Sequence, residues 1–139
     1  MSAWFGRVGA GKDALPDNKP SVWLVTDASF KESDAKAVGA GCEEEGVPLA
    51  WFTQNAKNVG SGSSSELARV ACLRSRLETG IGICPERKGA IALFSVADAP
   101  YLERDVNTPS RLRWLGQTAA RISKGEPIMY ETEGVDGHE

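Results

Sequence analysis

Three consecutive glutamates, Glu43 to Glu45, form the feature of the sequence most open to chemistry. They fall in the last turn of a predicted helix, where the helix dipole is already negative and each carboxylate costs about 0.3–1 kcal/mol at low salt. Successive helical residues are separated by about 100° around the axis, so the three side chains cannot share one face. Val38 and Cys42 mark the core side of this helix, and Glu44 lies well away from it. We therefore expect Glu44 to project outward, into solvent alone, toward a hard cation or toward a basic partner surface.

The final predicted helix carries four basic residues, namely Arg111, Arg113, Arg121 and Lys124. Cations near a helix C-terminus complement its dipole, and most of this set fits a solvated face. The other interpretation is that these residues meet an acidic partner.

The segment from Gly6 to Lys12 has the Gly-x-x-x-x-Gly-Lys spacing of a phosphate-binding loop. Asp13 follows at the position where that motif needs Ser or Thr to hold magnesium, and a carboxylate there repels phosphate. Pro16 interrupts any helix that would follow. We interpret the match as a coincidence and expect no nucleotide site in this chain.

A Ser-rich run from Ser61 to Ser65 precedes another predicted helix, and helix N-termini can bind anions. Ser63 and Glu66 have the spacing of a capping box, which explains the run without a ligand. A small-molecule-binding α/β protein or enzyme that uses the Ser61–Ser65 loop is the alternative function for the chain.

The single histidine, His138, is the penultimate residue. A Ser-His-Asp triad and a His-ligated zinc or cobalt need an ordered imidazole within the fold, so these chemistries are disfavoured. The Asp-x-His-x-x-Gly motif of cobalamin-binding domains is also absent from the sequence.

The cysteines Cys42, Cys72 and Cys84 are odd in number and lack Cys-x-x-Cys spacing, which indicates buried free thiols in a reducing cytosol. Cys84 is a weak candidate for a reactive thiol because Arg87 and Lys88 follow it.

The composition is that of an ordinary globular chain. Of the 139 residues, 41% are hydrophobic and 25% are charged, and the formal net charge is −3. This mild acidity disfavours nucleic-acid binding, which needs clustered Lys and Arg. No apolar run approaches the roughly 20 residues that cross a bilayer, and residues 1–12 lack the apolar core of a secretory signal. We expect a cytoplasmic protein.

Short apolar runs predict strands at residues 21–26, 49–53, 79–84 and 90–95, with a further short strand within 101–106. Helical spacing predicts helices within residues 31–45, after Ser63, and from Thr108 to about Lys124. Gly46 and Gly125 are the stop signals of the first and last of these helices.

This order of elements predicts an α/β fold, a single small layered domain with a mixed sheet of four to five strands and about three helices. We assign the domain to residues 20–128. Residues 1–19 are expected to be a flexible extension, and residues 129–139 an acidic tail.

Three segments resemble the small subunit of the diol/glycerol dehydratase-reactivating factors. They are residues 41–48 (GCEEEGVP), 80–83 (GIGI) and 119–127 (AARISKGEP). In that family a helix ending in acidic residues and Gly-Ile/Val-Pro precedes the second strand, and Ala-Arg, two further residues and Lys-Gly close the last helix. The resemblance covers residues 21–128 and implies a fold similar to that of the dehydratase medium subunit.

The resemblance implies a chaperone-like role and no catalysis by this chain. In that family, a small subunit pairs with a large Hsp70-like ATPase subunit as α2β2, and the large subunit binds ATP and ADP. The complex releases damaged cobalamin from inactivated adenosylcobalamin-dependent dehydratase, through exchange of the small subunit with the dehydratase medium subunit. The resemblance leaves open whether the target prefers glycerol or 1,2-propanediol, and whether the protein associates with a bacterial microcompartment.

The resemblance also implies a magnesium site. In family members the middle carboxylate of the acidic run helps to coordinate Mg²⁺ at the contact with the large subunit. That position is Glu44 here, and Glu43 or Glu45 takes its place if the alignment shifts by one residue.

Overall fold

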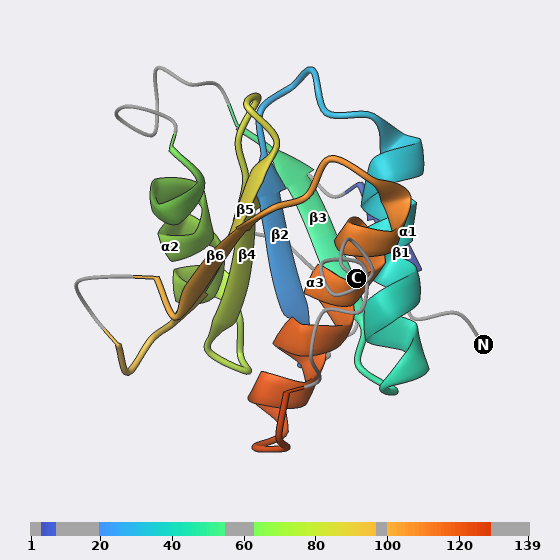
Figure 1. Ribbon diagram of the computed structural model, residues 1–139. Coiled ribbons are helices and arrows are strands. Elements are labelled where there is room, and N and C mark those ends of the chain that lie inside the picture. The colour runs from blue at the N-terminus through green and yellow to red at the C-terminus, as the bar shows by residue number, and fades with distance from the viewer. Residues whose placement is uncertain (1–3, 8–19, 55–62, 97–99, 129–139) are drawn as a thin grey trace, which may run out of the picture.

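The computed structural model describes residues 4–7, 20–54, 63–96 and 100–128, which form a six-stranded mixed sheet with three helices (Figure 1). The strands are β1 (Trp4–Arg7), β2 (Val22–Thr26), β3 (Leu49–Thr53), β4 (Thr79–Ile83), β5 (Lys88–Leu93) and β6 (Leu102–Asp105). The helices are α1 (Glu32–Glu44), α2 (Ser64–Arg74) and α3 (Pro109–Ser123).

The sheet has the strand order β1-β3-β2-β4-β5-β6. The first four strands in this order are parallel, and β5 and β6 continue the sheet in antiparallel pairing. Parallel neighbours need crossover connections, and α1 and α2 supply them. The chain leaves β2 toward β3 and later returns across β2 to β4, so the carboxyl ends of β2 and β4 mark the point where the connections diverge.

The helices form two layers around the sheet. Helices α1 and α3 cover one face and α2 covers the other (Figure 1). All five residues of β2 are buried, as expected for a strand covered on both faces. Val22 and Leu24 point into the core beneath α1 and α3, whereas Trp23 and Val25 point toward α2.

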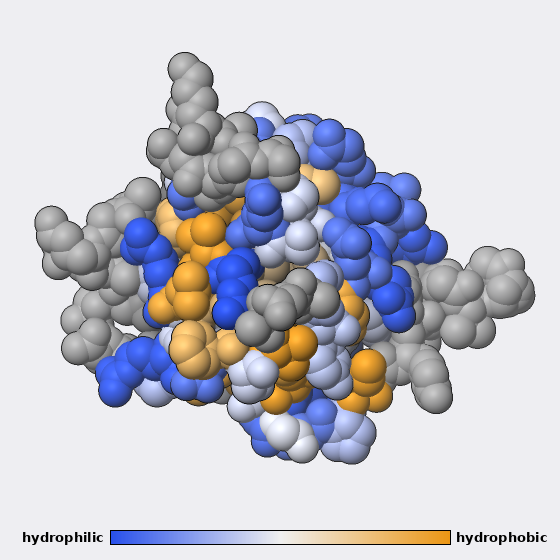
Figure 2. All heavy atoms as spheres, turned by 90° about the vertical axis from the view of Figure 1, so that its left-hand side faces the viewer, coloured by the Kyte–Doolittle hydropathy of each residue, from blue (hydrophilic) through white to orange (hydrophobic). Residues whose placement is uncertain are grey.

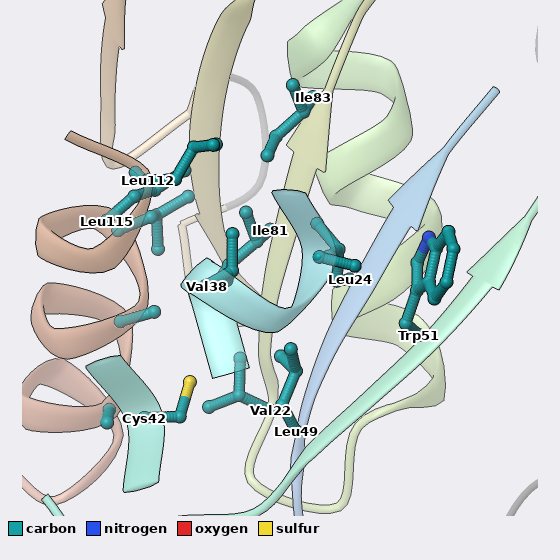
Figure 3. Packing of buried hydrophobic residues seen from close by; sticks show 14 of the residues in the cluster. Val22, Leu24, Val38, Cys42, Leu49, Trp51, Ile81, Ile83, Leu112 and Leu115 are labelled. Carbon is teal, nitrogen blue, oxygen red and sulfur yellow. The ribbon is translucent and has the colours of Figure 1, made fainter. Parts of the chain in front are cut away.

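The larger core lies between the sheet and the α1–α3 pair. Figure 3 shows Val38 and Cys42 of α1 gathered with Leu112 and Leu115 of α3 above Val22, Leu24 and Ile81 of the sheet. This apolar contact fixes the two helices side by side, and it therefore decides which of their outward-facing side chains can meet.

Close approach of α1 to α3 depends on two glycines. A Cβ atom at Gly41 would lie 2.0 Å from the Arg113 carbonyl oxygen, and one at Gly116 would lie 2.0 Å from the Val38 carbonyl oxygen. Neither position can accept a side chain without separation of the helices. On the other face Gly80 and Gly82 let α2 lie directly on β4 in the same way.

The predicted fold class, the five strands after residue 20 and the three helices are confirmed, with boundaries shifted by a few residues. Helix α2 begins with the predicted cap, in which the Glu66 N–H donates to Ser63 Oγ over 3.2 Å. Helix α3 begins in the same way, with the Arg111 N–H donating to Thr108 Oγ1 over 3.2 Å.

Strand β1 is not among the predicted strands, since it falls in the segment expected to be a flexible extension. Its four residues pair in parallel with β3 at the edge of the sheet. Four residues that include Gly6 carry no measurable periodicity, so this strand depends on the neighbouring strand rather than on a local signal. The rest of the 1–19 segment and the 129–139 tail lie outside the described residues. No helix in the described part of the chain has the length and apolar character needed to cross a membrane.

Candidate functional site

The acidic run lies where α1 ends, in a Schellman turn. Glu45 is the C-cap and Gly46 adopts a left-handed φ of 73°. The Val47 N–H donates to the Cys42 carbonyl over 3.1 Å, and the Gly46 N–H donates to the Glu43 carbonyl over 2.9 Å. The turn therefore holds the backbone that carries all three carboxylates.

Helix α3 also ends in a Schellman turn, which lies beside the end of α1. Lys124 is the C-cap, Gly125 has a φ of 75°, and the Glu126 N–H donates to the Arg121 carbonyl over 2.9 Å. Lys124 Nζ reaches across to the Glu45 carbonyl oxygen at 2.7 Å. The C-termini of the two helices, each the negative end of its helix dipole, thus meet around the basic side chains of Arg121 and Lys124.

Glu45 is bound into this junction. Arg121 Nη1 lies 3.2 Å from each of its carboxylate oxygens, Lys124 Nζ lies 3.3 Å from Oε1, and the side chain is only 12% exposed. Burial favours a higher pKa for the Glu45 carboxyl. The hydrogen bonds from Lys124 and Arg121, together with their charges, outweigh burial and hold the pKa below its ordinary value. Glu45 is therefore an ionised residue that joins α1 to α3.

Glu44 has a different environment one residue earlier. Its Oε2 contacts Arg113 Nη2, its Oε1 accepts a hydrogen bond from Gln117 Nε2 over 3.3 Å, and its side chain is 33% exposed. The Arg113 side chain is itself 59% exposed. Glu44 thus projects outward, as predicted, but toward a cation supplied by α3.

Glu43 is exposed, and its side chain makes no hydrogen bond or ion pair with the residues that the structure describes. The three adjacent carboxylates therefore occupy three environments: Glu43 in solvent, Glu44 in an exposed ion pair, and Glu45 in a nearly buried one. Within the described ranges no three His, Cys, Asp or Glu residues are grouped as a complete metal site.

These contacts change the interpretation of the basic residues of the last helix. Arg113, Arg121 and Lys124 contact the acidic run of the same chain, so they are not simply a solvated face. Sequence reasoning found both charge clusters and missed that they meet. The missing information was that α1 and α3 lie on the same face of the sheet, which periodicity alone does not give.

A polar groove of about 490 Å³ lies at the opposite end of α1. It opens where β2 and β4 end, a usual place for ligands in open α/β sheets. Asp27, Lys31, Asp34, Arg87 and Asn107 are the charged and amide residues among those that line it. Arg87 is already paired with Asp34 at 3.0 Å and stacks on Phe30. The sequence signals did not identify this groove, because its walls come from three separate segments, residues 27–34, 84–87 and 107–109.

The other candidates from the sequence are either engaged within the fold or lie outside the described residues. Ser61 lies outside the described residues, Ser63 caps α2, and Ser64 donates a hydrogen bond to the Glu103 carboxylate. The Gly6–Lys12 segment lies mostly outside the described residues as well.

All three thiols are buried. Burial raises the pKa of Cys42 to about 12, and burial also raises the pKa of Cys72. Cys84 is 6% exposed, and Arg87 points toward Asp34 instead. The structure therefore favours the interpretation of the cysteines as small buried apolar residues.

The face over α2 exposes several large apolar side chains. Leu73, Phe94, Val96 and Tyr101 are 38–59% exposed. Figure 2 shows apolar and charged residues intermixed on this face, rather than one continuous apolar surface. Such a surface carries less information about a partner than the charged end of α1 does.

Residues 19–129 match the family of dehydratase medium subunits. The chain belongs to that family. The matched part contains the acidic run, α3 and the groove, and it leaves out the Gly6–Lys12 segment. No curated protein sequence matches this member of the medium-subunit family.

Two solved structures are similar to this medium-subunit-family chain. A chain of glycerol dehydratase reactivase is 29% identical, with a TM-score of 0.71, and the match covers 81% of this chain and 99% of that one. A chain of a diol dehydratase-reactivating factor complexed with ADP and Mg²⁺ is 25% identical, with a TM-score of 0.66. This match covers 81% of the present chain and 100% of that one. The resemblance found in the sequence is thus confirmed at the level of the fold and of the kind of protein.

Proposed function

We propose that this chain is the non-catalytic small subunit of a dehydratase-reactivating factor. One observation carries the proposal: the described domain accounts for 99–100% of two chains from reactivating factors, and it belongs to the dehydratase medium subunit family. A protein that shares its fold with a dehydratase subunit can occupy that subunit's place, and this supports exchange with the medium subunit as the mode of recognition.

The partner is a large Hsp70-like ATPase subunit, and the assembly is α2β2. ATP and ADP bind to the large subunit. This assignment is supported by Asp13, which stands where the phosphate-binding motif at Gly6–Lys12 needs Ser or Thr. It is also supported by the ADP and Mg²⁺ found with a similar factor. The assembly releases damaged cobalamin from inactivated diol or glycerol dehydratase in the cytoplasm or in a microcompartment.

Glu44 contributes to a Mg²⁺ site shared with the large subunit. A carboxylate oxygen is a ligand that Mg²⁺ prefers, and this ion is usually held by one or two carboxylates with other ligands from elsewhere. Within the described residues no group of three His, Cys, Asp or Glu includes the acidic run. In the complex the partner therefore supplies further protein ligands, and in the isolated chain water occupies those positions. Glu44 suits this role better than Glu45, because the Glu44 side chain is 33% exposed whereas that of Glu45 is 12% exposed and bound by both Arg121 and Lys124.

Co-purification tests the assignment. The tagged chain is co-expressed with a large subunit and purified with ADP and Mg²⁺, and a stable complex is expected. Absence of a complex under every nucleotide condition would overturn the proposal. Glu44→Gln should weaken the complex while circular dichroism stays unchanged, and Glu43→Gln is the charge-matched control. Equal complex formation by both variants would show that Glu44 has no metal role.

The alternative is a small-molecule-binding protein. The groove at the carboxyl ends of β2 and β4 favours this alternative more than the Ser61–Ser65 loop does, because the described serines are used within the fold. A ligand that raises the melting temperature of the isolated chain, together with no protein partner, would support it.

A further inference from the structure

We propose that Arg113 is an internal competitor for the Glu44 carboxylate, so that the cation at the subunit interface binds only by displacing its guanidinium. This inference rests on the proposed function of Glu44 and concerns the regulation of the same site. It assigns a role to Arg113 of α3, which lies 69 positions after Glu44 in the sequence (113 − 44).

The geometry gives Arg113 this role. Its Nη2 atom contacts Glu44 Oε2, one of the two oxygens with which the carboxylate could bind a metal ion. The other oxygen accepts a hydrogen bond from the neutral Gln117 amide, which leaves the charge of the site to the arginine. Gly41 and Gly116 allow the close helix approach that keeps Arg113 beside Glu44. A hard cation and the guanidinium therefore compete for the same oxygen.

The Arg113–Glu44 ion pair is weak enough for a cation to displace the guanidinium. Both side chains remain partly in solvent, 59% exposed for Arg113 and 33% for Glu44. Exposed ion pairs change an equilibrium by only about two- to five-fold. The guanidinium thus lowers the affinity of Glu44 for a cation without preventing binding. Arg121 cannot have this role, because Glu45 and Arg121 are 12% and 22% exposed and Lys124 is a second partner.

The test uses the isolated full chain and Mn²⁺, a paramagnetic substitute for Mg²⁺. Binding is followed by the broadening of the backbone amide NMR signals of residues 43–46. Arg113→Gln should tighten the apparent Mn²⁺ Kd by about two- to five-fold, and Arg113→Lys should lie between this variant and the wild type. Arg104→Gln on β6 removes the same charge away from the site and serves as the control.

Three results decide the inference. Tighter binding in Arg113→Gln than in Arg104→Gln, lost again in the double variant Glu44→Gln/Arg113→Gln, is the expected outcome. Equal or weaker binding in Arg113→Gln would overturn it, since a residue that orients Glu44 toward the metal would weaken binding when removed. Absence of localised broadening would overturn it as well. Because no partner is present, these outcomes are separate from failure to form a complex with the large subunit.

Discussion

The properties of Glu44 and Glu45 at the end of α1 are set by their neighbours on α3 and at its C-cap. Glu44 and Glu45 are adjacent and chemically identical, yet Glu44 is in an exposed ion pair and Glu45 in a nearly buried one. The same residue type is therefore open to an external cation at one position and structural at the next. This difference is not visible in the sequence, where all three glutamates appear equally unfavourable beside the helix dipole.

We predict that Glu45→Gln lowers the free energy of unfolding by about 1–3 kcal/mol at pH 7, because it removes charge-assisted hydrogen bonds from a nearly buried site. Urea unfolding measures the effect. Glu43→Gln, at an exposed position of the same run, should change the stability by less than about 0.5 kcal/mol. Similar losses in the two variants would contradict the structural role of Glu45.

The lowered pKa of Glu45 predicts that the stability of the folded chain depends on pH. The pKa of Glu45 is lower in the folded chain than its ordinary value of 4.5, so its stabilisation is complete above that pH. The contribution declines as the pH falls below 4.5 and is lost once the pH is below the folded-state pKa. The stability difference between wild type and Glu45→Gln should therefore shrink in acid. A difference that stays constant from pH 7 to pH 3 would be inconsistent with the lowered pKa.

We predict that Cys42 is unreactive in the folded chain. Burial raises its pKa to about 12, and its thiol donates a hydrogen bond to the Gly116 carbonyl over 3.3 Å. The thiolate is the reactive form, so labelling by a thiol reagent at pH 8 should be far slower in native protein than in urea. Mass spectrometry of the labelled peptides identifies the residue. Rapid labelling of native Cys42 would show that the α1–α3 contact opens readily.

At the scale of the elements, the fold could be predicted because local signals and burial agree. Val22 to Thr26 is a fully buried apolar strand, Ser63 and Thr108 cap the helices that they precede, and Gly46 and Gly125 end helices in left-handed turns. Each of these signals acts over a few residues. The pairing of α1 with α3 joins residues more than 60 positions apart, so the Arg113–Glu44 and Arg121–Glu45 contacts could not be predicted from spacing.

We predict that Gly116→Ala destabilises the chain by about 1–3 kcal/mol, because the added methyl group overpacks the contact with the Val38 carbonyl. Denaturant unfolding measures the loss. Ser110→Ala, at an exposed position of the same helix, is the control and should change the stability by less than about 0.5 kcal/mol. If Gly116→Ala is as stable as this control, α1 and α3 are not in the close contact described.

For the whole molecule, the charged end of the α1–α3 pair and the groove lie at opposite ends of α1. The charged end carries the proposed contact with the large subunit. The groove lies at the carboxyl ends of the parallel strands. A chain with this arrangement can bind one protein partner while its other end stays accessible. Its place in the medium-subunit family, rather than any catalytic cluster, connects it to dehydratases.

The most direct test is the reactivation of inactivated dehydratase. The inactive enzyme is incubated with the large subunit, ATP, Mg²⁺ and fresh adenosylcobalamin, with and without this chain, and the recovered dehydratase activity is measured. The account predicts recovery only when the chain is present, and weaker recovery with Glu44→Gln than with Glu43→Gln. Full recovery with the large subunit alone, or no recovery when both subunits are present, would contradict the assignment of this chain as the small subunit of a reactivating factor.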